Sequence, residues 1–160
     1  MSMDTSAPTE PVRKSVRVAC DVDRAFRVFV EDFARWWPAE VHSRAAHDQY
    51  GDGVTVEHVV FEQRVGGRLY EVTSEGVEGS WAEVVLFEPP HRLVLAWKPN
   101  DRDEPPTEVD VRFEEDGDGT VVHLEHRGWD RLDDRAAEAR DGYAQGWSEP
   151  LERFAAAVAG

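Results

Sequence analysis

Residues 78–98, EGSWAEVVLFEPPHRLVLAWK, predict a β-hairpin around which the rest of the fold can be arranged. The runs 84–87 and 93–97 are rich in β-branched and large apolar side chains, which favour strands. Pro89 and Pro90 lie between these runs, where they end the first strand because proline lacks a backbone donor and has a fixed φ angle. The hairpin therefore predicts two neighbouring antiparallel strands, the second of which ends in a tryptophan.

The segments on either side of the hairpin repeat this pattern. Upstream, residues 54–73 alternate apolar and polar side chains on both sides of a Gly66-Gly67 turn. Downstream, residues 107–126 alternate in the same way around a turn made of two Asp-Gly pairs. We expect five strands in meander order, preceded by a strand over 12–19. The predicted sheet is therefore antiparallel and six-stranded.

Two other segments show helical spacing. Near the N-terminus, residues 21–36 place apolar side chains at helical intervals after an aspartate that can cap a helix, which predicts two short helices. Near the C-terminus, residues 132–158 predict one long amphipathic helix. Gly146 and Pro150 lie within it, so we expect a kink or a restart there, with Ser148 as the candidate N-cap.

These elements predict the fold class. An antiparallel sheet with one apolar face has to bury that face, and the amphipathic C-terminal helix offers a matching surface. The result is a two-layer α+β domain. A sheet that curves around a helix usually leaves a gap between the layers, and this gap is the expected place of a functional site.

Length, charge and cysteine content narrow the class of protein. The 160 residues predict a single domain over 11–160, after a disordered tail over 1–10. Neither a secretory signal nor an apolar run long enough to span a bilayer is recognisable. The single cysteine fits a reducing cytoplasm, where we expect the protein. The net charge of −15 repels phosphate backbones and anionic lipids, so we expect neither nucleic-acid binding nor membrane insertion; a monomer and a homodimer both remain open.

No sequence motif indicates a metal, a cofactor or a nucleophile. His123 and His126 are three residues apart on a predicted strand, so they point to opposite faces and cannot chelate one ion. His42 and His47 could approach each other in a polar loop, but no cysteine accompanies them. A phosphate-binding glycine loop, a nucleophile elbow and a Ser-His-Asp arrangement are absent from the sequence. We therefore expect no metal and no cofactor, and we assign no catalytic residue.

Three polar side chains fall on predicted apolar faces. They are His126 on the last strand, His58 among the valines of an early strand, and Glu83 beside Trp81 and Val85. A polar group on a buried face needs a partner, which is either a structural hydrogen bond or a ligand. Glu83 is the only obvious acid for proton transfer, unless it faces solvent at the edge of the sheet.

Aromatic side chains are the main candidates for a ligand-binding surface. Six tryptophans in 160 residues can either pack the core or line a cavity that favours flat, apolar molecules. Strand alternation does not decide between Trp97 and its neighbour Ala96 for the inner face. Together with the two histidines above, the predicted ligand-binding residues are Trp37, His58, Trp97, Phe113, His126, Tyr143 and Trp147.

Taken together, several motifs resemble the family of homologues of the heat-shock-protein ATPase activator, within the START-like or SRPBCC superfamily. The hairpin over 82–97, with EPPHRL at its centre and a terminal tryptophan, is the most specific of them. The resemblance extends over about residues 13–159. Its other parts are an opening helix that ends in tryptophans, at residues 22–37, and a glycine turn, at residues 65–68. A closing strand and final helix correspond to residues 126–128, 146–147 and 151–158.

The resemblance implies a fold and a range of functions. The fold would be a helix-grip, in which a curved antiparallel sheet wraps around a long C-terminal helix and two small helices close one end. Members of the superfamily bind lipids, polyketides, hormones or other hydrophobic molecules between sheet and helix, and some branches are cyclases or aromatases. Two positions depart from the family pattern, because Ala82 replaces a glycine before the hairpin and Pro150 interrupts the final helix.

Three functional hypotheses follow. The first is a non-enzymatic or at most weakly catalytic carrier or sensor that holds a small hydrophobic or aromatic molecule between the sheet and the C-terminal helix. The second is an enzyme of the cyclase or aromatase type that uses a histidine or Glu83 in the cavity. The third is a chaperone-associated module that binds a protein partner through its acidic surface.

Overall fold

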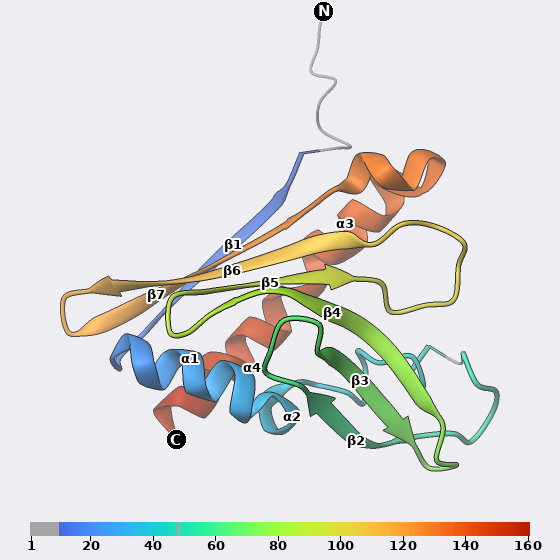
Figure 1. Ribbon diagram of the computed structural model, residues 1–160, viewed down its shortest axis with the longest axis horizontal. Helices are drawn as coiled ribbons and strands as arrows, with labels where there is room; N and C mark the ends of the chain where they lie inside the picture. Colours follow the sequence, from blue (N-terminus) through green and yellow to red (C-terminus); the bar gives the residue numbers. More distant parts are fainter. Residues whose placement is uncertain (1–9, 48) are drawn as a thin grey trace, which may run out of the picture.

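The computed structural model describes residues 10–47 and 49–160, so all of the predicted tail except Glu10 lies outside the described residues. The described chain forms one antiparallel sheet with helices packed on one face (Figure 1). The strands are β1 (Val12–Val18), β2 (Val56–Phe61), β3 (Arg68–Thr73), β4 (Glu78–Glu88), β5 (Arg92–Trp97), β6 (Thr107–Asp116) and β7 (Gly119–Arg127). The helices are α1 (Val22–Glu31), α2 (Phe33–Trp36), the 3₁₀ helix η2 (Trp129–Arg135), α3 (Ala136–Gly146) and α4 (Ser148–Ala159).

The sheet has seven strands in the order β1-β7-β6-β5-β4-β3-β2, one strand more than predicted. The meander contains six strands instead of the expected five, because the segments 54–73 and 107–126 contribute two strands each, separated by a turn, in addition to the two strands of the hairpin. Gly66 and Gly117 in these turns have φ angles of 85° and 64°, which glycine adopts without steric cost. β1 pairs with β7 and so completes the sheet at the opposite edge from β2.

The two short N-terminal helices form as predicted. The side chain of Asp21 accepts a hydrogen bond from the backbone amide of Arg24 at 2.9 Å, which caps the first turn of α1. Phe26 and Phe29 are buried on the face that α1 turns towards the interior. α2 ends in Trp36, and the chain then enters a long connection that reaches β2 at residue 56.

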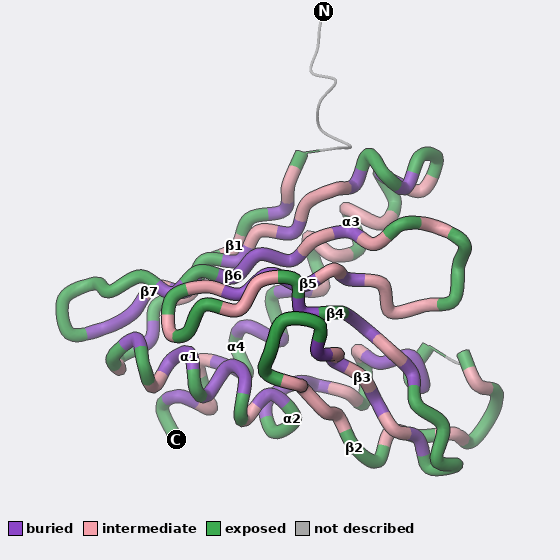
Figure 2. The backbone as a smooth tube through the Cα atoms, viewed as in Figure 1, coloured by how far each residue is buried: buried purple, intermediate pink, exposed green. Residues whose placement is uncertain are grey.

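The inner face of the sheet is apolar. Along β5, β6 and β7, alternate side chains turn towards the helices, and these include Leu95, Val111 and Leu124, each at most 2% exposed. Trp97 lies on this inner face at 5% exposure, which settles the choice between Trp97 and Ala96. Figure 2 shows the buried residues gathered along the central strands and the helices that cover them.

The outer face of the central strands carries a buried carboxylate under arginines. Asp110 is 2% exposed, and its carboxylate accepts hydrogen bonds from Arg92 and Arg127 at 2.8 and 2.9 Å. Burial alone would raise the pKa of Asp110, but the hydrogen bonds from these arginines outweigh it and lower the pKa below its usual value. Asp110 therefore ties three neighbouring strands together on the solvent side.

The C-terminal helix restarts where the sequence analysis expects a break. α3 ends at Gly146 and α4 begins at Ser148, while Trp147 between them keeps helical backbone angles of −75° and −17°. The N-cap position of α4 is Trp147, and no side chain caps the helix, so the prediction of Ser148 as the cap is wrong. Pro150 falls in the first turn of α4, where a backbone amide has no partner within its own helix and a missing donor costs little.

One end of the space between sheet and helices is filled by phenylalanines from three elements. Phe29 of α1 lies 5.6 Å from Phe113 of β6 and 5.3 Å from Phe154 of α4, measured between ring centroids. Phe26 contacts Phe113 at 5.1 Å. These four residues, called the phenylalanine cluster below, are each at most 3% exposed. This end of the interface is therefore solid core.

Candidate functional site

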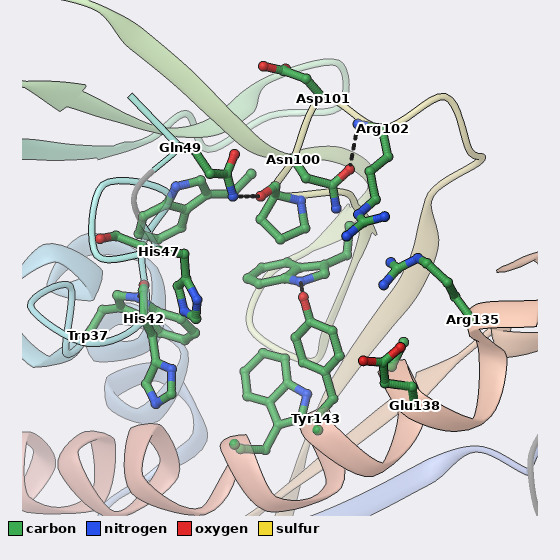
Figure 3. A pocket seen from close by; sticks show the side chains of 18 residues that line it. Trp37, His42, His47, Gln49, Asn100, Asp101, Arg102, Arg135, Glu138 and Tyr143 are labelled. Carbon is green, nitrogen blue, oxygen red and sulfur yellow. Dashed lines mark hydrogen bonds between the residues drawn. The ribbon is translucent and has the colours of Figure 1, made fainter. Parts of the chain in front are cut away.

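The other end of the same interface holds an open pocket of about 940 Å³ (Figure 3). Three parts of the chain surround it: the connection between α2 and β2, the loop between β5 and β6, and helix α3. Five aromatic side chains line it, called the aromatic wall below: Trp37, Trp81, Trp97, Tyr143 and Trp147. The volume is of the size that drug-sized ligands occupy in proteins.

The rings of the aromatic wall pack against one another. Trp37 stands at its centre, with ring centroids 5.7 Å from Trp81, 6.1 Å from Trp97 and 5.8 Å from Trp147. Trp97 and Trp147 are 5.6 Å apart. Each of the four indoles is at most 8% exposed, so the wall is held by its own contacts on the side away from the pocket.

Every indole N–H of the aromatic wall is already bound within the protein. Trp37 donates to the carbonyl of His42 at 2.6 Å, and Trp97 donates to the hydroxyl of Tyr143 at 3.0 Å. The remaining pairs are Trp81 with the carboxylate of Glu71, and Trp147 with Nδ1 of His126 at 3.0 Å. The tryptophans therefore have no free N–H to offer a ligand, and they present ring carbons to it.

His126 lies behind the wall and supports it. Its Nδ1 accepts the indole N–H of Trp147, so the ring proton sits on Nε2, which is 2.7 Å from Oγ1 of Thr107. That hydroxyl in turn donates to the carbonyl of Trp97 at 3.3 Å. Burial lowers the pKa of His126 to about 3, so the ring is neutral at physiological pH. Of the two roles considered for His126, the structure supports the structural hydrogen bond.

Glu71 holds the connection between α2 and β2 against the sheet. This carboxylate on β3 is fully buried and accepts the backbone amides of Arg44 and Ala45 at 2.7 and 3.0 Å. It also accepts the indole N–H of Trp81, as described above. A buried carboxylate is stable when such donors surround it, and here they fix both a loop and one tryptophan of the wall.

Two loops are tied together at the pocket mouth. The guanidinium of Arg44 forms an ion pair with Asp101 at 2.7 Å and donates to the carbonyl of Ser80 at 3.1 Å. Gln49 donates to the carbonyl of Pro99 at 3.0 Å, across the same gap (Figure 3). The connection that carries Arg44 and the loop that carries Asp101 are therefore linked to each other as well as to the sheet.

Small residues on α3 create the space in front of the aromatic wall. Ala139, Gly142 and Gly146 line the pocket on this helix. A Cβ atom added to Gly142 or Gly146 would meet no atom within 4 Å. The pocket is therefore open in front of Gly142 and Gly146, which carry no side chain, whereas Tyr143 on the same helix belongs to the wall.

Charged and titratable side chains surround the opening. Arg135 of η2 forms a two-point ion pair with Glu104 at 3.1 and 3.0 Å. His42 lines the pocket, and burial lowers its pKa, an effect that the nearby Glu149 opposes. Within residues 10–47 and 49–160, no three histidine, cysteine, aspartate or glutamate side chains are grouped so that they could hold a metal ion.

The structure brings four of the seven predicted ligand-binding residues to the pocket: Trp37, Trp97, Tyr143 and Trp147. His126 lies directly behind them, and Phe113 belongs to the phenylalanine cluster at the other end of the interface.

His58 and Glu83 are exposed and lie away from the pocket, so their predicted placement on apolar faces is wrong. In both cases the regular alternation of the strand is broken. The register of β2 shifts between Val56 and His58, and that of β4 shifts at Trp81, so these side chains leave the face that strict alternation assigns to them.

Several residues of the site were not predicted from the sequence. Trp81 was one of the six tryptophans considered for the core or a cavity but was not among the predicted ligand-binding residues, yet it is part of the wall. For Glu71 the sequence does contain a signal, which is the alternation of Leu69, Glu71 and Thr73 on one face of the predicted strand. The structure shows that all three side chains are fully buried. The contribution of Gly142 and Gly146 has no signal in the sequence, since a glycine on a helix indicates a pocket only when its surroundings are known.

A second depression, of about 880 Å³, lies on the outer face of the sheet. Charged side chains dominate its lining, including Arg13, Arg112 and Glu125. It lacks the aromatic surface of the first pocket, so we place the candidate site between sheet and α3. No helix in the described part of the chain is both long and apolar enough to cross a membrane.

A curved antiparallel sheet with a C-terminal helix across one face, and a pocket between them, defines a helix-grip protein of the START-like class. The family model for "Activator of Hsp90 ATPase homolog 1-like protein" matches residues 19–159. The chain therefore belongs to this family. Among curated proteins, none matches the sequence.

Solved structures with the same fold include two with substantial sequence identity. An anthrahydroquino-γ-pyrone synthase, solved as a complex, is 31% identical over 94% of this chain and 98% of its own, with a TM-score of 0.62. The self-sacrificing resistance protein CalC from Micromonospora echinospora is 29% identical over 94% of this chain and 95% of its own, with a TM-score of 0.70. A protein from Chromobacterium violaceum, 17% identical over 93% of this chain and 96% of its own, with a TM-score of 0.65, shares the fold.

Proposed function

We propose that the protein binds a small hydrophobic, aromatic compound in the pocket between the sheet and α3, as a carrier or sensor. The observation that carries this proposal is the aromatic wall, whose four indole N–H groups are all bound within the protein. Such a wall offers flat apolar rings on a surface that is already ordered, which favours a flat apolar partner.

The expected affinity is moderate. A tricyclic compound that removes about 400 Å² of apolar surface from water, counted over ligand and pocket, gains about 10 kcal/mol. Part of this is offset by the loss of translational and rotational freedom, and the pocket is open on one side. We therefore expect dissociation constants on the order of micromolar for simple aromatic compounds.

One of the named relatives agrees with this proposal. One is a synthase for an anthrahydroquino-γ-pyrone, a compound class that contains fused aromatic rings, and the other is a resistance protein. Their identities of 31% and 29% extend over nearly the whole chain. We transfer from the synthase only the kind of compound, which is a fused-ring aromatic compound.

Ligand-dependent stabilisation tests the proposal. A panel of fused-ring aromatic compounds and fatty acids is screened by thermal unfolding, and binding is confirmed by quenching of tryptophan fluorescence. At about 100 times its dissociation constant, a ligand should raise the unfolding midpoint by about 5 °C or more. The Gly146→Leu variant, which fills the pocket from α3, should lose the effect, whereas Ala156→Leu on the exposed side of α4 should keep it. If no aromatic compound stabilises the protein, the proposal is wrong.

A catalytic role on the bound compound is the second candidate, favoured by the two histidines that line the pocket, His42 and His47. The residues first considered for this chemistry do not support it, because His58 and Glu83 are exposed elsewhere and both ring nitrogens of His126 are bonded. Incubation with each ligand from the screen, followed by mass spectrometry, distinguishes the two. A carrier or sensor returns its ligand unchanged, and conversion that is lost in His42→Gln would indicate an enzyme.

A further inference from the structure

Tyr143 carries the one hydroxyl group of the aromatic wall. Its side chain rises from α3 into the pocket, with its hydroxyl against the indole of Trp97 (Figure 3). The oxygen accepts the indole N–H of Trp97 at 3.0 Å. Among the described residues, none accepts the proton of the Tyr143 hydroxyl. This O–H group is therefore available to a ligand.

The remaining polar atoms of the wall are committed. The indole N–H groups of Trp37, Trp81 and Trp147 are bound to the carbonyl of His42, the carboxylate of Glu71 and the ring of His126. An indole has no other polar atom. The wall thus offers a ligand one hydrogen-bond donor and no acceptor beyond the Tyr143 oxygen, which Trp97 already occupies.

The donor is a strong one and remains protonated. Because Trp97 donates to the Tyr143 oxygen, it polarises the hydroxyl and makes its proton a better donor. Burial raises the pKa of Tyr143, so the hydroxyl keeps its proton throughout the physiological range. A phenol in this state donates its proton to an acceptor oxygen of the ligand.

We propose that the bound compound is an aromatic ketone or quinone, whose ring carbonyl accepts a hydrogen bond from the Tyr143 hydroxyl while its rings lie against the tryptophans. This inference rests on the proposed function and adds the chemical class of the ligand to it. A carbonyl fits because it is a neutral acceptor without a proton that would need a partner in the wall. Tyr143 is thereby the residue that determines specificity.

A hydrocarbon of the same shape binds less well for a physical reason. The Tyr143 hydroxyl belongs to the pocket lining, and a hydrocarbon would lie against it without offering an acceptor. A buried donor without a partner is costly, and the loss corresponds to about tenfold or more in affinity. The preference for a carbonyl over a methylene group at the same position is therefore a direct measure of this hydrogen bond.

Fluorenone and fluorene form the matched pair for the test, because they differ only in a carbonyl against a methylene group. Dissociation constants are measured by fluorescence quenching for the wild type and for Tyr143→Phe, Trp97→Phe and the double variant. In Tyr143→Phe the indole N–H of Trp97 is released and could replace the lost donor, so the double variant is needed to remove both. Far-UV circular dichroism and thermal unfolding verify that each variant is folded.

The wild type should prefer fluorenone about tenfold, and Trp97→Phe should retain a preference because it keeps the Tyr143 hydroxyl. In the double variant the two compounds should bind equally. The infrared carbonyl stretch of bound fluorenone should lie at lower wavenumber in the wild type than in the double variant. Equal affinities in the wild type, or a preference that persists in the double variant, would overturn this inference while the aromatic pocket stands. If neither compound binds, and no other aromatic compound does, the proposed function itself is overturned.

Discussion

The two ends of the interface between sheet and helices are both lined by aromatic rings, but only one of them is open. At the closed end, the phenylalanine cluster joins α1, β6 and α4 with ring distances from 5.1 to 5.6 Å. At the open end, the aromatic wall stands behind a pocket of about 940 Å³. The same C-terminal helical segment covers both ends, as α4 at the first and α3 at the second.

The difference lies in what orients the rings. Phenylalanine has no polar atom, so its orientation depends on complete packing on all sides. The tryptophans of the wall are each held by one hydrogen bond to the protein in addition to their contacts, and one side of them can therefore face a pocket. This comparison indicates that a helix-grip protein can keep part of its interior open without leaving its rings disordered.

The largest effect should follow from a cavity at the closed end. Phe154→Ala removes a ring that is fully buried and contacts Phe29 and Trp36. We expect the free energy of unfolding to fall by about 3–5 kcal/mol, because no polar anchor compensates for the lost packing. Denaturant unfolding measures this. Tyr143→Phe at the open end should cost about 1 kcal/mol, and an equal cost at both ends would contradict the comparison.

At the open end, a buried histidine should make stability depend on pH. Burial lowers the pKa of His126 from 6.5 to about 3, so between these values the unfolded chain binds a proton that the folded protein does not. The contribution is complete above pH 6.5 and is lost as the pH falls towards 3, by up to about 1.4 kcal/mol per pH unit. At pH 4.5 we expect a loss of about 2–3 kcal/mol.

The matched control is His126→Gln, measured by denaturant unfolding at the same pH values. Carboxylates titrate alike in both proteins, so their effect cancels in the difference between the two curves. The wild type should lose more stability than the variant between pH 6.5 and 4.5. Parallel curves would show that His126 is not held neutral by its surroundings.

Filling the open end should change binding more than stability. Gly146→Leu places a side chain in space where an added Cβ meets no atom within 4 Å. We expect the affinity for an aromatic ligand to fall about tenfold or more, while the free energy of unfolding changes by less than about 1 kcal/mol. Isothermal titration and denaturant unfolding measure the two quantities. A loss of stability like that of Phe154→Ala would mean that the space is already occupied.

The smallest effect concerns the helix that leaves the pocket open. Gly142 lies inside α3 and an added Cβ would meet no atom, so Gly142→Ala should stabilise the protein by about 0.5–1 kcal/mol. One methyl group in a pocket of this size should leave ligand affinity within about threefold. Thermal unfolding with and without ligand tests both statements. Destabilisation would indicate that α3 is held against the wall more closely than the structure shows.

Much of the fold follows from local pattern. The alternation in 107–126 and the Pro89-Pro90 turn predict strands that form as expected, and the break near Gly146 is where the C-terminal helix restarts. The number of strands was underestimated by one, because the segments 54–73, 78–98 and 107–126 each contribute two strands to the meander. Ser148 was not the cap because Trp147 keeps helical angles and lets the helix continue almost without interruption.

The site was less predictable, for two physical reasons. The strand register is irregular at Trp81 and at His58, and each irregularity reverses the face that the following side chains occupy. The position of such an irregularity depends on the pairing with the neighbouring strand and not only on the sequence of the strand itself. The connection between α2 and β2 has no periodicity, and its position depends on the buried carboxylate of Glu71. Tyr143 and Trp147 could be predicted because they combine helical spacing with aromatic character.

Hydrogen bonding of the tryptophans extends beyond the pocket. Trp36 and Trp129 donate to the carbonyls of Val28 and His126, so all six indoles of the chain are donors to the protein. A nitrogen-15 correlation spectrum should therefore show six indole signals that exchange slowly with deuterium, each with a shift set by its own acceptor. The protein thus carries a built-in set of reporters, in which the Trp97 signal alone is coupled to the hydroxyl of Tyr143 and can follow what occupies the molecule in solution.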